Sequence, residues 1–106
     1  MGRPLDPTVD HSISLAEAAD AARRHRQDGS HRPGDSGAFN AKPILALLAQ
    51  PGCVGMRFYR GRNAKGDDSL VLVGVDKEGN DMTDGPLVNG HLPCPPFCSD
   101  DNDLNT

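Results

Sequence analysis

Hydrophobic residues recur at a helical spacing in two segments of the first half of the chain. In residues 14–27 they fall at positions i, i+3, i+4 and i+7 of one helix face, and they are Leu15, Ala18, Ala19 and Ala22. Ser14 and Glu17 have the spacing of a capping box at the start of this helix. Because alanine side chains bury little area, we expect this helix to pack closely but weakly.

A second helix is predicted in residues 39–50. Its apolar stripe consists of Ile44, Leu47 and Leu48. Asn40 is a candidate N-cap, and Pro43 is compatible only with the first helical turn. Between the two helices, residues 28–37 have the Gly- and Ser-containing composition of a linker.

The hydrophobic period changes to two after residue 52. In residues 53–60 large apolar side chains alternate with small or polar ones, which predicts a strand with one face in water. Residues 69–75 are apolar on both faces, and the side chains concerned are Leu70, Val71, Leu72, Val73 and Val75. A strand of this kind is usually covered on both sides.

Two helices and a hairpin do not easily cover both faces of that strand, and a two-stranded sheet is marginal in water. The extra cover has three candidate sources: a third strand near residues 85–89, the proline-rich end folded back, or another subunit. We therefore expect an α+β fold, with two N-terminal helices followed by a β-hairpin or small antiparallel sheet. The expected divisions are an extended arm (1–11), a small α+β domain (12–85) and a Pro-rich, acidic C-terminal tail (86–106).

Charge is distributed unevenly along the chain, whose net charge is −4. Residues 1–66 carry ten Lys or Arg and six Asp or Glu, a balance of +4, whereas residues 67–106 carry one Lys and nine acids, a balance of −8. The acidic end is expected either to lie over a basic surface, its own or a neighbour's, or to remain solvated. The acidic total does not favour nucleic acid as a partner, although residues 23–32 and 57–65 are basic.

Targeting and compartment follow from the termini and the cysteines. Residues 1–10 have no apolar run of a signal peptide, and no stretch approaches the ~20 apolar residues of a membrane helix. The chain has three cysteines, and an odd number fits a reducing compartment better than a disulfide framework. A cytoplasmic protein without membrane contact is therefore expected.

The segment HLPCPPFC, residues 91–98, holds most of the candidate chemistry. His91, Cys94 and Cys98 could bind zinc, and Cys94 with Cys98 could form a redox pair. In an extended polyproline conformation the two cysteines would stand ~12 Å apart, too far for either role. A cis Pro96 in a turn would bring them together. The favoured interpretation is an extended docking tail with free thiols, centred on Pro95, Pro96 and Phe97, and no cofactor.

The segments PGCVGMRFYRG and LVLVGVDKEGNDM, together with the CPPFC ending, resemble an uncharacterised family of short bacterial proteins. The similarity covers about half of the chain, residues 44–82 and the tail. It implies a shared fold unit and a recurring tail. It implies no reaction, and it assigns no catalytic residue.

These patterns favour a non-enzymatic module for protein–protein interaction or self-assembly, whose partner is itself or another subunit. The expected contacts are the apolar strand residues at 70–75 and the docking stretch Pro95, Pro96 and Phe97. The first alternative is a thiol-based redox or zinc-binding module that uses Cys94 and Cys98. The second alternative is a precursor whose Cys-containing tail is modified.

Overall fold

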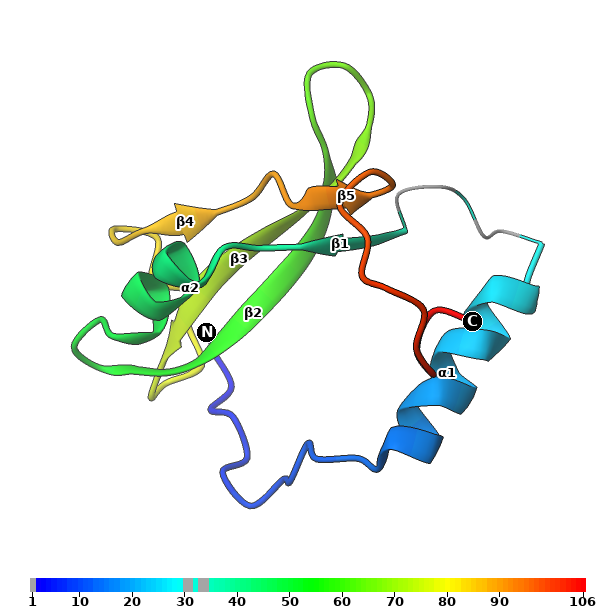
Figure 1. Cartoon of the computed structure of the whole chain (residues 1–106). Coiled ribbons are helices and arrows are strands. Elements are labelled where there is room, and N and C mark those ends of the chain that lie inside the picture. The colour runs from blue at the N-terminus through cyan, green and yellow to red at the C-terminus, as the bar shows by residue number, and fades with distance from the viewer. Residues whose placement is uncertain (1, 30–31, 33–34) are drawn as a thin grey trace. The chain divides into compact units, whose positions relative to one another are not determined.

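Two helices and five strands are formed by the residues that the structure, a computed structural model, describes, namely 2–29, 32 and 35–106 (Figure 1). Contacts divide the chain into two units. One unit consists of Met1–Pro7 with Phe39–His91, and the other of Thr8–Ala38 with Leu92–Thr106. This division differs from the contiguous domain expected at residues 12–85, because each unit joins segments that are far apart in the sequence.

The first unit contains a three-stranded antiparallel sheet in the order β2–β3–β4. β2 spans Cys53–Arg62, β3 spans Asp68–Asp76 and β4 spans Leu87–Val88. The two strands predicted at residues 53–60 and 69–75 are confirmed, and each is slightly longer than predicted. β4 lies inside residues 85–89, where the sequence offered a third strand.

Helix α2, Ala41–Leu48, belongs to the same unit and contacts β2, β3 and β4. Asn40 occupies the N-cap position, but its side chain makes no capping hydrogen bond. Pro43 lies in the first turn, as its missing N–H requires. Leu47 is fully buried. The helix is therefore held by Leu47, with Ile44 half-buried, rather than by its cap, while Leu48 of the predicted stripe is exposed.

Each face of the sheet is partly covered from within this unit, mainly over β3. Phe58 pairs with Leu72 and Met56 with Gly74, so their side-chain positions share one face. Gln50 follows α2, and its side chain lies 2.7 Å from the position that a Cβ on Gly74 would occupy. The Gln50 side chain therefore covers the face that carries Leu72 and Phe58.

On the opposite face, the Leu5 side chain lies 2.6 Å from the Cβ position of Gly55. The backbone of Arg3 occupies the space beside Gly79, where any side chain would collide. Arg3 and Leu5, in the segment predicted as an extended arm, therefore lie against this unit.

The second unit combines helix α1, Leu15–Gln27, with a two-stranded antiparallel sheet. The predicted capping box is confirmed: Glu17 N–H donates to the Ser14 hydroxyl, and Ser14 N–H donates to the Glu17 carboxylate. β1, Ser36–Ala38, pairs with β5, Leu92–Cys94.

The prediction that residues 28–37 are only a linker is wrong at its end, where β1 begins. Residues 30, 31, 33 and 34 of that linker lie outside the described residues. Across the part of the chain that is described, no helix combines the length and apolar character that a membrane crossing requires.

Candidate functional site

Strand β2 forms an open edge of the three-stranded sheet. Among the residues that the structure describes, it pairs only with β3. Met82 N–H donates to the Gly74 carbonyl at 2.8 Å, on the side of β3 away from β2. In an antiparallel strand the N–H and C=O of one residue point to the same edge. Both groups of Gly74 therefore point away from β2, and Met56 with Gly74 is a non-hydrogen-bonded pair.

The backbone groups of Met56 consequently point to the open edge of β2. Because this direction alternates along a strand, those of Phe58 and Arg60 point outward as well. An unpaired edge with outward N–H and C=O groups is a template for an added strand. The alternating pattern was visible in the sequence, but the sequence did not reveal that β2 is at the edge.

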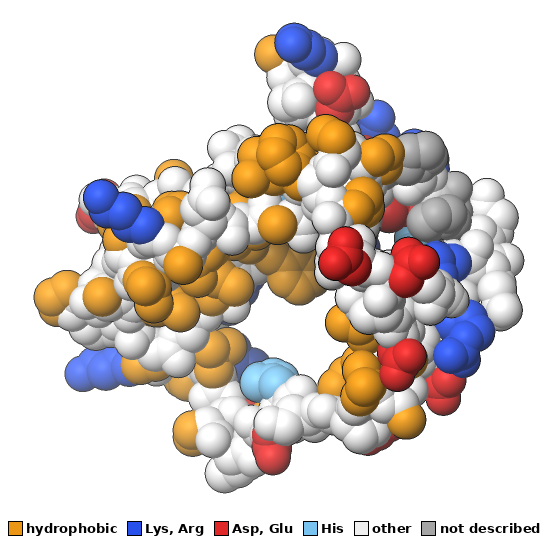
Figure 2. Space-filling model, in the orientation of Figure 1, with side chains coloured by type: hydrophobic (Ala, Val, Ile, Leu, Met, Phe, Trp, Pro, Cys, Tyr) orange, Lys and Arg blue, Asp and Glu red, His pale blue; other side chains and the backbone are white. Residues whose placement is uncertain are grey.

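Large apolar side chains are exposed beside this edge. Phe58 is 61% exposed, Met56 44% and Tyr59 48%. Leu45 and Leu48 of α2 are also exposed, and hydrophobic side chains are visible at the surface around α2 (Figure 2). We define the β2 edge as Met56, Phe58 and Arg60 with their outward backbone groups.

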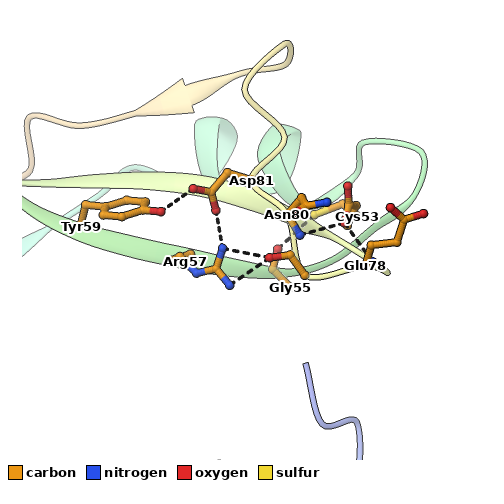
Figure 3. A network of polar contacts seen from close by, with 9 residues as sticks. Cys53, Gly55, Arg57, Tyr59, Glu78, Asn80 and Asp81 are labelled. Atoms are coloured by element: carbon orange, nitrogen blue, oxygen red, sulfur yellow. Dashed lines mark hydrogen bonds and ion pairs between the residues drawn. The ribbon is translucent and has the colours of Figure 1, made fainter. Parts of the chain in front are cut away.

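A polar network fixes the other face of β2 (Figure 3). Arg57 Nη1 donates to Asp81 Oδ1 at 2.5 Å, and the Tyr59 hydroxyl donates to Asp81 Oδ2. The hydrogen bond from Tyr59, with help from Arg57, holds the pKa of Asp81 below its usual range. The same bond raises the pKa of Tyr59. The network neutralises one of the three arginines of β2 and orients its side chain.

The turn after β3 supports this network. The Asp76 carboxylate accepts hydrogen bonds from the N–H groups of Glu78 and Asn80, at 2.9 and 3.0 Å. This arrangement turns the Gly79 carbonyl toward Arg57, whose guanidinium donates two hydrogen bonds to it at 3.2 and 3.3 Å. Gly79 has φ +86°, a conformation that favours glycine.

The apolar residues of β3 named from the sequence are largely covered. Leu72, Val73 and Val75 are buried, and Leu70 and Val71 are half-buried. Their cover comes from the chain itself, and of the three sources that the sequence argument offered, the third strand near residues 85–89 is present as β4. The exposed apolar side chains lie instead on the neighbouring strand β2, which that argument left out.

The cysteines of the tail form a disulfide in this structure. Cys94 and Cys98 have Cα atoms 4.8 Å apart, and their sulfur atoms are bonded. Phe97 N–H donates to the Pro93 carbonyl at 2.9 Å, which closes a turn. The peptide bonds before Pro95 and Pro96 are both cis. The predicted extended tether with free thiols is therefore wrong, because the chain reverses at the prolines.

The closed disulfide loop presents Pro95, Pro96 and Phe97 at the surface, with Phe97 56% exposed. The disulfide engages two of the three residues named as zinc ligands, and the third, His91, stacks edge-on against Phe39 with ring centroids 6.1 Å apart. Within the described ranges, no group of three His, Cys, Asp or Glu side chains is arranged to hold a metal ion.

The acidic end of the chain contacts the basic end of α1. Arg26 Nη1 donates to the Leu104 carbonyl at 2.6 Å. A shallow hollow here is lined by Ala16, Ala19, Asp20, Arg23, Asp103 and Thr106. Two of its charged side chains are paired with each other, since Arg23 binds Asp20 at 2.6 Å. Because a backbone carbonyl makes the contact with Arg26 rather than an acidic side chain, the choice between a docked and a solvated acidic end stays a prediction.

Comparison with known proteins adds no name to this site. No protein-family model matches the chain, and no curated protein or solved structure matches it. The resemblance to short bacterial proteins therefore stays a prediction, and the functional assignment depends on the geometry of the β2 edge and the disulfide loop.

Proposed function

We propose that this chain is a non-enzymatic protein–protein interaction module that binds its partner by strand addition at the β2 edge. One observation carries the proposal: β2 is a ten-residue edge strand beside exposed Met56 and Phe58. Strand addition takes affinity from main-chain hydrogen bonds and specificity from alternate side chains. The β2 edge offers both.

The flanking structure also supports this proposal. Natural edge strands are commonly protected by inward-pointing charges, prolines or a covering loop. β2 contains no proline, and its bulge lies at its first residues, between Cys53 and Gly55. Arg57, the charge nearest its centre, is neutralised by Asp81. The middle of the strand is therefore left apolar and open.

Photo-crosslinking tests the proposal. A benzophenone amino acid replaces Phe58 in one variant and Phe97, on the disulfide loop, in another, and both are expressed in the native host. We expect protein adducts from position 58 and none from position 97. Adducts from position 97 alone would move the docking site to the disulfide loop, and adducts from neither would contradict the interaction function.

A thiol-based function is the second candidate, and the Cys94–Cys98 disulfide favours it. In such a cycle the disulfide accepts two electrons and two protons from a substrate dithiol, which becomes a disulfide as both cysteines become thiols. The expected cytoplasmic location adds weight, because disulfides there are usually transient or catalytic.

Intact mass measured across a series of glutathione redox buffers tests the second candidate. A midpoint for the two-hydrogen mass change inside the cellular range would support cycling. A disulfide that stays oxidised throughout that range would be a structural cross-link, and the redox function would be wrong.

A further inference from the structure

We propose that the strand added at the β2 edge is β2 of a second copy, antiparallel and centred on Phe58. The two three-stranded sheets then become one six-stranded sheet. This inference depends on the proposed strand addition and names its partner. It follows from the direction of the backbone groups, the order of side chains and the positions of the arginines in β2.

The first step is the backbone. A two-fold axis at Phe58 sets Phe58 opposite Phe58 of the second copy, and Met56 opposite Arg60 of the second copy. All these residues direct N–H and C=O to the open edge, as derived from the Gly74–Met82 hydrogen bond. Residues that point toward each other in this way form the hydrogen-bonded pairs of an antiparallel ladder. The edge is therefore complementary to itself.

The second step is the apolar cluster. Met56 and Phe58 share the face of β2 that also carries Leu72. In the pairing centred on Phe58, two phenylalanines stand opposite each other, and each Met56 is diagonal to the Phe58 of the other copy. Four exposed apolar side chains meet across the new contact. Aromatic and apolar cross-strand pairs of this kind stabilise an antiparallel ladder.

The third step is charge, which disfavours the two adjacent registers. A pairing centred on Arg57 sets two arginines directly opposite each other, and one centred on Tyr59 brings the two copies of Arg60 to diagonal positions. Arg60 has no ion pair with a described residue. The pairing centred on Phe58 instead sets Arg60 opposite Met56. Its closest like charges are the diagonal Arg57 side chains, each already bound to Asp81.

Disulfide trapping tests this register. In a Cys53→Ser background, the Phe58→Cys variant should form a covalent dimer in air. Hydrogen-bonded antiparallel pairs have Cα atoms about 5.5 Å apart, within the range of about 4.4–6.8 Å that a disulfide spans. The matched control is Met56→Cys in the same background, whose two copies stand four residues apart along the strand, about 13 Å. We expect no bridge in the control, and equal trapping of both variants would overturn the register.

Hydrodynamic measurements test the dimer without cysteines. Phe58→Pro removes an outward N–H and leaves the β2–β3 ladder intact, whereas Phe58→Val keeps that N–H. Sedimentation should give a dimer for the unmodified chain, a monomer for Phe58→Pro and a dimer for Phe58→Val. A chain that is monomeric at every concentration would overturn self-pairing. If position 58 still crosslinks a different protein, strand addition survives; if it crosslinks nothing, both proposals fail.

Discussion

The two units of this chain are stabilised by different means. The unit containing β2, β3, β4 and α2 holds all but one of the buried apolar residues described, and these are Leu47, Leu72, Val73 and Val75. The unit containing α1, β1 and β5 buries one apolar residue, Ala19. It has instead the Cys94–Cys98 disulfide and polar contacts such as Arg26 to Leu104.

This contrast has a simple physical origin. Burying a leucine or valine side chain contributes about 1.5–3 kcal/mol, whereas an alanine contributes much less because it removes little surface from water. The apolar face of α1 consists mainly of alanines, so the helix gains little from packing. A unit with so small a core depends on a cross-link, as small domains commonly do. The two units should therefore respond to different perturbations.

The largest expected effect is in the unit with the core. Leu47→Ala removes a fully buried side chain and should lower the free energy of unfolding by about 2–5 kcal/mol. Leu45→Ala, on the same helix but 64% exposed, is the matched control and should change it by less than ~0.5 kcal/mol. Urea unfolding measures both. Similar losses for the two variants would contradict the placement of α2 on the sheet.

An intermediate effect is expected in the other unit. Replacing both Cys94 and Cys98 by serine opens a loop whose ends are four residues apart, and the chain-entropy estimate for so short a loop is about 2 kcal/mol. The amides of β1 and β5 should lose protection from hydrogen exchange, while those of β2 and β3 keep theirs. If all strands lost protection equally, the two units would not differ as described.

The smallest expected effect is the pH dependence from the network of Arg57, Tyr59 and Asp81. Because folding lowers the pKa of Asp81, its contribution is present above about pH 4 and is lost as the pH falls toward the folded pKa. Because folding raises the pKa of Tyr59, its contribution is present below about pH 10 and is lost at higher pH.

Asp81→Asn should flatten both limbs of the stability profile measured by thermal unfolding between pH 3 and 11. The control is Asp84→Asn, an exposed carboxylate whose replacement should leave both limbs unchanged. A profile for Asp81→Asn identical to that of the unmodified chain would show that the network contributes nothing.

Local signals in the sequence predicted local structure. The Ser14–Glu17 capping box, the stripe of α2, the alternation in β2 and the apolar run in β3 each depend on residues a few positions apart. The pairing of Ser36 with Cys94 and the packing of Arg3 beside Gly79 join distant segments and have no periodic signal. These long-range contacts were therefore not predicted, although they decide what covers the sheet and where the tail turns.

The candidate site shows the same limit. The alternating pattern of β2 placed Met56 and Phe58 on one side of a strand. The contact residues predicted from the sequence were instead those of β3, which is apolar on both faces and largely buried in the fold. Whether a strand is central or at an edge depends on pairing order, which the sequence of one strand does not encode. An extended polyproline tail favours free thiols over a disulfide, whereas the observed reversal at the prolines brings Cys94 and Cys98 together.

Hydrogen exchange at single amides of β2 tests the proposed edge most directly. In the dilute chain the outward amides of Met56, Phe58 and Arg60 should exchange rapidly, and the inward amides of Arg57 and Tyr59 should be protected by β3. As the protein concentration rises, protection should appear at Met56, Phe58 and Arg60 alone. If these three amides remain unprotected at every concentration, β2 does not pair with a second copy.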